Sequence, residues 1–156
     1  MCRREARAAS DKADVFRAAG AARVVALVKE DLGKEVAEFK ADFWKEEVMK
    51  DTDLAFYHAL GGGQAHKPFK SGCAFIAAML NPFNKTRTKQ NVKASKGVPQ
   101  NMIGEGLVAG GTYVLRADGV PAYSFAEQEL GDSAPLEDVV AAVKSAAAEA
   151  GADGRI

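Results

Sequence analysis

Hydrophobic positions in the first third of the chain follow a helical period and then a strand-like run. Small apolar residues recur at helical spacing at Ala6, Ala9, Ala13 and Phe16, and Gly20 is placed to end that helix. Residues 23–29 follow with the continuous apolar run VVALV. A strand that is apolar on both faces is typical of a parallel strand covered by helices on each side, so we expect residues 23–29 to be an interior strand.

The middle of the chain alternates helix and strand again. Residues 34–43 have the pattern of a second short helix, and residues 47–50 that of a short strand. Asp51 follows as a plausible N-cap for a helix ending at Leu60, because a carboxylate accepts hydrogen bonds from free backbone N–H groups. The glycines at 61–63 predict a turn, since no Lys-Ser/Thr follows them as a phosphate-binding loop requires.

The C-terminal third predicts a hairpin and a final helix. Residues 112–116 and 122–125 alternate as strands around the turn Asp118-Gly119. Asp132 or Ser133 is expected to cap the last helix, with Pro135 in its first turn. Its buried stripe consists of Leu136, Val139, Val140, Val143 and Ala147.

These elements indicate one α/β domain over residues 1–150, with a short tail at 151–156. A chain of 156 residues is long enough for one well-buried core. Residues 64–103 interrupt the pattern as an insert, in which 75–80 has helical character and 84–100 reads as a polar, basic surface loop.

Charge is balanced overall but unevenly distributed. Lys plus Arg and Asp plus Glu both number 21, which gives no reason to expect a nucleic-acid partner. No acidic residue occurs between Asp53 and Glu105, and this segment contains the cations Lys67, Lys70, Lys85, Arg87, Lys89, Lys93 and Lys96. The segment is either an interaction surface for an anionic partner or an ordinary solvated loop and helix face.

The two cysteines are too few for a disulfide framework, which fits an intracellular, reducing compartment, cytoplasmic or organellar (plastid or mitochondrion). His58 and His66 have no Cys or His at ligand spacing, so we expect no metal site and no cofactor. No run of 18 apolar residues is present, and we expect no transmembrane segment. Cys2 is the candidate redox thiol, because a helix N-terminus and the adjacent Arg3 and Arg4 would both favour its thiolate.

Several segments together resemble the peroxiredoxin-like 2 family of the AhpC/TSA, thioredoxin-fold clan. The segments that carry the resemblance are Val28-Lys29-Glu30, Phe43, Asp51, Phe56-Tyr57-His58-Ala59-Leu60-Gly61, Gly104-Glu105-Gly106, Gly110-Gly111-Thr112-Tyr113-Val114 and Leu130-Gly131-Asp132. The resemblance implies a thioredoxin-like sandwich, with a mixed central sheet flanked by helices, and a redox role with a C-x-x-C pair at the start of the first helix.

The chain departs from this family in two places. Cys2 matches the second cysteine of the pair, so the first cysteine and the strand before it are absent from these 156 residues. Phe125-Ala126 stands where relatives often carry His-Arg. In a thioredoxin-like sheet the absent strand lies between residues 23–29 and 112–116. Its absence would leave two half-sheets whose unpaired backbone groups each cost about 1–3 kcal/mol when buried. The sequence is therefore an incomplete version of a longer protein, or something else fills the gap.

Two functions remain open at this stage. The first is thiol-dependent reduction of peroxides or disulfides, with Cys2 attacking and a second thiol resolving the product. Cys73 is a possible second thiol, although its alanine-rich surroundings favour a buried core residue. A protein reductant of the thioredoxin or glutaredoxin type would then be the partner. The second is a non-catalytic thioredoxin-like accessory subunit of a larger assembly, including one at an organellar membrane.

Overall fold

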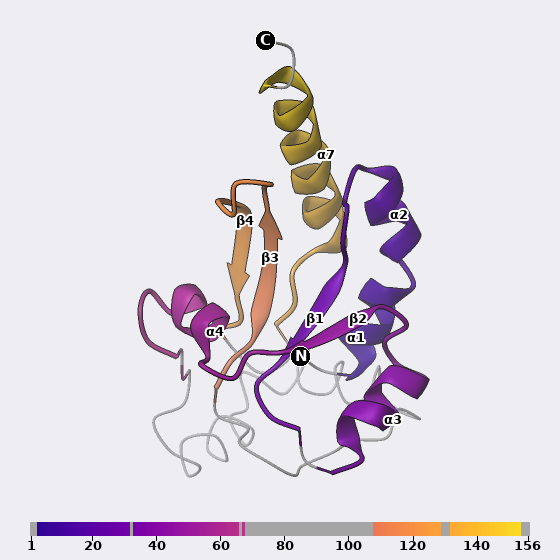
Figure 1. The fold of residues 1–156 in the computed structure, drawn as a ribbon, viewed down its shortest axis with the longest axis vertical. Coiled ribbons are helices and arrows are strands. Elements are labelled where there is room, and N and C mark those ends of the chain that lie inside the picture. The colour runs from indigo at the N-terminus through magenta and orange to yellow at the C-terminus, as the bar shows by residue number, and fades with distance from the viewer. Residues whose placement is uncertain (1–2, 32, 66, 68–107, 129–131, 154–156) are drawn as a thin grey trace, which may run out of the picture.

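The computed structural model describes residues 3–31, 33–65, 67, 108–128 and 132–153. Figure 1 shows helices and strands arranged side by side, with the long C-terminal helix at one end. The elements in chain order are α1 (Arg3–Ser10), α2 (Ala13–Ala18), β1 (Val25–Val28), α3 (Glu35–Asp42), β2 (Glu47–Lys50), α4 (Ala55–Leu60), β3 (Gly111–Leu115), β4 (Pro121–Ala126) and α7 (Leu136–Asp153). The predicted segments at 75–80 and 84–100 lie outside the described residues.

The predicted first helix is in fact two helices. The chain turns at residues 11 and 12, where the Lys12 N–H bonds the Ala9 carbonyl at 3.0 Å instead of the carbonyl four residues back. At the break the Ser10 hydroxyl accepts the N–H of Lys45, 35 positions away, at 3.0 Å, and Ser10 is only 6% exposed. The apolar spacing was correct, because Ala6, Ala13 and Phe16 are all buried.

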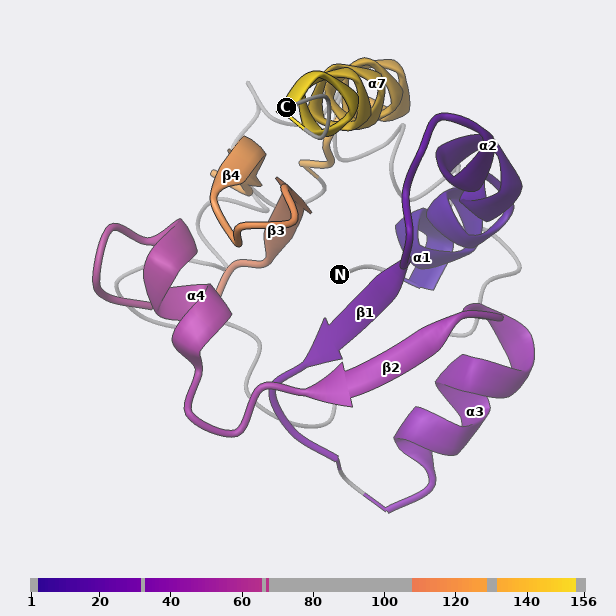
Figure 2. The same ribbon diagram turned by 45° about the horizontal axis from the view of Figure 1, so that its top comes forward.

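The strands form two separate two-stranded sheets in the described part of the chain. β1 and β2 are parallel, with Val25 opposite Glu47 and Val28 opposite Lys50. β3 and β4 form the predicted antiparallel hairpin, closed by Asp118 and by Gly119 at φ +82°. In Figures 1 and 2, β1 and β3 are the inner strands, with β2 and β4 outside them.

The inner edges of β1 and β3 have no strand partner among the described residues. The Val28 carbonyl accepts the Asp51 N–H at 2.9 Å, so Val28 and Ala26 direct their backbone groups toward β2. Val25 and Leu27 consequently direct theirs to the inner edge. At that edge the Leu27 carbonyl accepts a hydrogen bond from the Tyr57 hydroxyl at 3.4 Å. In a continuous sheet a backbone N–H would be the donor to this carbonyl. β1 is thus apolar, with Ala26 buried and its other three residues half-buried. Among the described residues it is paired on one edge only, which differs from the interior strand that we predicted.

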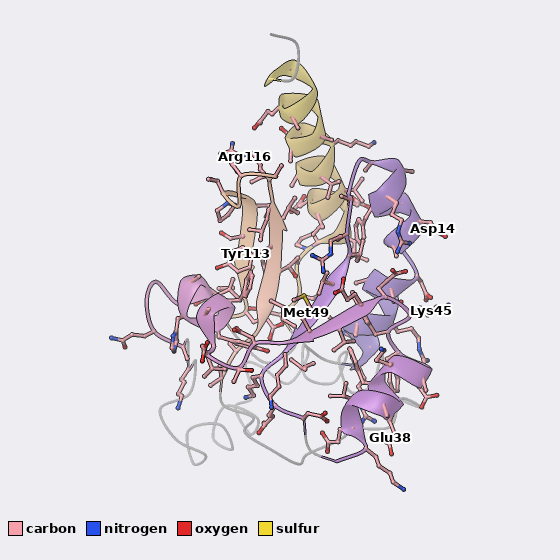
Figure 3. All side chains as sticks on the ribbon, in the orientation of Figure 1. Asp14, Glu38, Lys45, Met49, Tyr113 and Arg116 are labelled. Atoms are coloured by element: carbon pink, nitrogen blue, oxygen red, sulfur yellow. The ribbon has the colours of Figure 1, made fainter. Side chains whose placement is uncertain are left out.

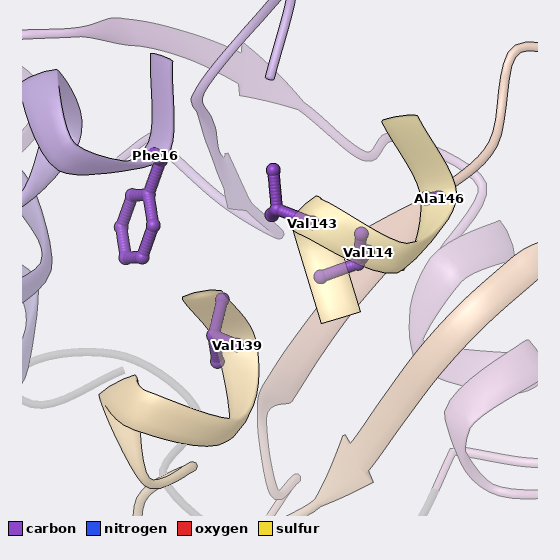
Figure 4. Close-up of a cluster of buried hydrophobic side chains, with 5 residues drawn as sticks. All are labelled: Phe16, Val114, Val139, Val143 and Ala146. Carbon is purple, nitrogen blue, oxygen red and sulfur yellow. The ribbon is translucent and has the colours of Figure 1, made fainter. Parts of the chain in front are cut away.

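Two hydrophobic clusters lie on either side of this break. Figure 4 shows the first, in which Phe16 of α2 and Val114 of β3 meet Val139, Val143 and Ala146 of α7. This confirms most of the stripe predicted for the last helix, with Ala146 as an addition. The second cluster consists of Ala6, Ala26 and Trp44. Val24 packs against both clusters and joins them.

Candidate functional site

The first turn of α1 is the described part of the chain next to Cys2. Cys2 itself lies outside the described residues and directly precedes Arg3, the first residue of α1. Ala6, with no exposed surface, packs α1 against Ala26 of β1 and against Trp44. The Trp44 indole N–H in turn donates to the Glu47 carbonyl at 2.8 Å. The start of α1 is therefore anchored on the first sheet.

The two arginines expected to support a thiolate both have partners of their own. The Arg3 guanidinium lies 5.2 Å from the centre of the Phe43 ring and 3.8 Å from Glu38, a residue of α3 labelled in Figure 3. The Arg4 guanidinium donates to the Glu5 carboxylate at 3.1 Å. Both remain cations in the first turn of α1, but Glu5 offsets the field of Arg4.

A half-buried carboxylate, Glu127, is part of this region and was missed by the sequence analysis. It directly follows β4, and its N–H donates to the Gly110 carbonyl at 3.0 Å. Burial raises the pKa of its carboxyl most, and the negative charges of Glu5 and Asp132 act in the same direction. The positive charge of the N-terminal amino group and the hydrogen bond from the Gly110 N–H oppose this rise. The charge of Glu5, in the first turn of α1, thus acts on Glu127 at the end of the hairpin. No local sequence signal distinguishes Glu127 from a surface glutamate.

The charge of Glu127 in turn acts on Tyr57 of α4. Burial raises the pKa of its phenol first, and the charges of Asp51, Glu127 and Glu30 raise it further. Its hydroxyl therefore stays protonated and is available as a donor. Phe56, the residue before it, meets Tyr113 of β3 edge to face with ring centres 6.2 Å apart (Figure 3 labels Tyr113). α4 thus closes the outer side of the hairpin's open end.

Asp51 positions α4 as the sequence predicted, although the helix starts later than expected. Its carboxylate accepts the N–H groups of Ala55 at 2.9 Å and Phe56 at 3.0 Å. The helix begins at Ala55, because Leu54 adopts a left-handed conformation at φ 54° before it. Asp51 also bonds β1 through its own N–H, so one residue connects the first sheet to α4.

The remaining residues singled out from the sequence are only partly placed. Of the seven basic residues in the insert, Lys67 is described and is exposed; Lys70, Lys85, Arg87, Lys89, Lys93 and Lys96 lie outside the described residues, as does Cys73. Within the described ranges no group of three His, Cys, Asp or Glu side chains is arranged to hold a metal ion. None of the helices in that part of the chain is long and apolar enough to cross a membrane.

Comparison with known proteins identifies the family to which this chain belongs. A family profile described as AhpC/TSA antioxidant enzyme matches residues 9–129, which is most of the chain. The chain belongs to this family. Among curated proteins, it is similar to Peroxiredoxin-like 2A of Danio rerio, with 31% identity over 80% of this chain and 53% of the relative. It is also similar to Peroxiredoxin-like 2A of Gallus gallus, with 30% identity over 92% of this chain and 58% of the relative.

These matches confirm the peroxiredoxin-like 2 assignment and, with it, a thioredoxin-like fold of mixed helices and strands. The chain spans little more than half the length of either AhpC/TSA relative. No solved structure gives a significant match to it.

Proposed function

We propose that this AhpC/TSA protein is a thiol-dependent oxidoreductase that reduces peroxides or disulfides through Cys2. The observation that supports this most is the position of Cys2, one residue before the first turn of α1, in a chain whose relatives are named peroxiredoxin-like. Unpaired N–H groups at a helix start and two nearby guanidinium groups favour a thiolate over a thiol.

The chemistry of such a thiolate follows directly. The sulfur attacks one oxygen of a peroxide, the O–O bond breaks, and the products are a sulfenic acid and an alkoxide or hydroxide that takes up a proton. A second thiol then condenses with the sulfenic acid to give a disulfide and water. A dithiol protein reductant restores the starting state by thiol–disulfide exchange. This cycle needs a reducing compartment, cytoplasmic or organellar.

The test combines thiol titration with peroxide consumption. Cys2→Ser should abolish peroxide consumption in the presence of a reductant, whereas Cys73→Ser should retain sulfenic acid formation because the attacking thiol is still present. In wild-type protein near neutral pH, iodoacetamide should label Cys2 faster than Cys73. Faster labelling of Cys73, or unchanged consumption in Cys2→Ser, would contradict the assignment of Cys2.

One observation favours a second function, a non-catalytic accessory subunit. Phe125 and Ala126 pair with Thr112 and Gly111 immediately before Glu127, so an apolar pair borders the candidate site where relatives often carry His-Arg. In this case the basic insert would provide the contact with an acidic partner surface. Reversing Lys85, Arg87 and Lys89 to glutamate should then release the protein from its assembly in a salt-titrated pull-down. Unchanged association would show that the insert is only a solvated loop.

A further inference from the structure

Met49 is an exposed methionine on the face of the first sheet that points away from the second cluster. It lies on β2 opposite Leu27 of β1, and it is 44% exposed. Successive residues of a strand point to opposite sides of the sheet. Ala26 belongs to the second cluster and its strand partner Val48 packs against that cluster, so Met49 points to the other side. Figure 3 labels Met49 and draws its sulfur in yellow.

The sulfur of Met49 has a hydrogen-bond donor fixed beside it. Nη2 of Arg23 donates to this sulfur at 3.8 Å. The same guanidinium also donates to the Glu47 carboxylate, from Nη2 at 2.7 Å and from Nε at 3.2 Å. Nη2 carries two hydrogens, so it can bond the carboxylate and the sulfur at the same time. Glu47 lies two residues before Met49 on the same face of β2, and its two-point contact with Arg23 holds the donor at the sulfur.

A fixed donor makes the two sides of a thioether sulfur unequal. The sulfur of methionine is polarizable and has two lone pairs, and its oxidation gives a sulfoxide that is chiral at sulfur. In a flexible peptide both lone pairs are open to an oxidant. At Met49 the N–H of Arg23 occupies one lone pair, so the other one remains for reaction. Oxidation in the folded protein should therefore favour one of the two sulfoxide epimers.

We propose that Met49 accepts oxygen from hydroperoxides, and that Arg23 determines which sulfoxide epimer forms. The free lone pair of the sulfur attacks the terminal peroxide oxygen, a sulfur–oxygen bond forms and the O–O bond breaks. The proton of the attacked oxygen passes to the leaving oxygen, so the products are methionine sulfoxide and an alcohol, or water when the oxidant is hydrogen peroxide. The sulfur loses two electrons and the peroxide gains them. This reaction uses no cysteine, so it is independent of the proposed thiol chemistry.

The experiment measures the rate and the epimer ratio of sulfoxide formation at Met49. The full 156-residue chain is treated with hydrogen peroxide in large excess over its thiols, and Met49 sulfoxide is followed in digests by mass spectrometry. Two methionine sulfoxide reductases, each specific for one epimer, then give the ratio. A synthetic peptide of residues 45–51 provides the rate and the ratio without the fold. Arg23→Ala removes the donor, and Arg17→Ala is the matched control, because Arg17 is an exposed arginine whose carboxylate partners are Glu46 and Asp14.

Met49 in the folded chain should oxidise at a rate within about tenfold of the peptide rate, because the residue is exposed. One epimer should exceed the other by about 3:1 or more, since an ordinary hydrogen bond corresponds to a preference of about 2- to 10-fold. Arg23→Ala should return the ratio to that of the peptide, whereas Arg17→Ala should keep the excess. Stronger protection of Met49 or a peptide-like ratio in the wild-type chain would overturn the proposal. An excess that survives Arg23→Ala, or one that is lost in Arg17→Ala, would overturn it as well.

Discussion

The contact between Gly20 and α7 gives a stability prediction that the structure determines closely. Gly20 follows α2 with φ +113°, and its N–H bonds the Arg17 carbonyl at 2.9 Å. A Cβ added at this position would lie 2.4 Å from the Cβ of Ala147. Gly20→Ala therefore meets two separate penalties, a strained backbone and a steric overlap with α7.

The size of each penalty can be assigned. A side chain in a backbone region reserved for glycine costs about 1–3 kcal/mol. Overpacking against a fixed neighbour costs a further amount of about 1–3 kcal/mol. We expect Gly20→Ala to lower the free energy of unfolding by about 2–6 kcal/mol, of which only the overlap depends on Ala147.

A double-mutant cycle separates the two terms. Ala147→Gly alone should cost about 1–2 kcal/mol, from lower helix propensity and one lost methyl group. In the presence of Gly20→Ala, the same change also removes the overlap, so the double variant should be about 1–3 kcal/mol more stable than the sum of the two separate effects predicts. Urea unfolding followed by far-ultraviolet circular dichroism measures all four proteins. Strictly additive changes would refute the contact between residue 20 and α7.

Three further predictions follow from buried polar groups. Asp51→Ala should cost about 2–4 kcal/mol in urea unfolding, because it leaves two N–H groups of α4 unpaired, whereas Asp53→Ala should have little effect. Trp44→Phe should cost about 1–3 kcal/mol, since it removes both packing volume and the hydrogen bond to Glu47; an unchanged midpoint would contradict the burial of the indole. Because the folded pKa of Glu127 lies above its unfolded value, its stabilising contribution is fully present below the unfolded pKa and is lost as pH rises through the folded one. Glu127→Gln should therefore gain stability relative to wild type as pH rises through that window, and a constant difference between them across the pH range would count against the raised pKa.

The sequence predicted those elements whose pattern is local. The strand at Glu47–Lys50 and the hairpin around Asp118-Gly119 have the expected positions, because turn chemistry and residue alternation are set by neighbours in the chain. The break between α1 and α2 was missed. At this break Ser10 accepts a hydrogen bond from the Lys45 N–H, 35 positions away, and the helical spacing of apolar residues gives no information about such a contact.

The candidate site was harder to predict than the fold. Cys2, Arg3 and Arg4 were singled out by their place at a helix start, but the pairing of Arg4 with Glu5 and of Arg3 with Glu38 depends on side-chain packing. Glu127 was missed because its partial burial depends on tertiary packing and the charge of Glu5 acts on it from a segment distant in sequence. A strand end followed by an acidic residue is common on protein surfaces and carries no information about burial.

The separation of the two sheets also determines how the molecule responds to stress. No backbone hydrogen-bond ladder connects β1 to β3 in the described ranges, so the two halves communicate through side-chain packing, with Val24 shared by both clusters. Proteins open locally in contiguous cooperative units, each with its own free energy of opening. We therefore expect the hairpin with α7 and the parallel pair with α1 to behave as two cooperative units. Glu5 and Glu127, which belong to different units, keep their spacing only while both units remain docked.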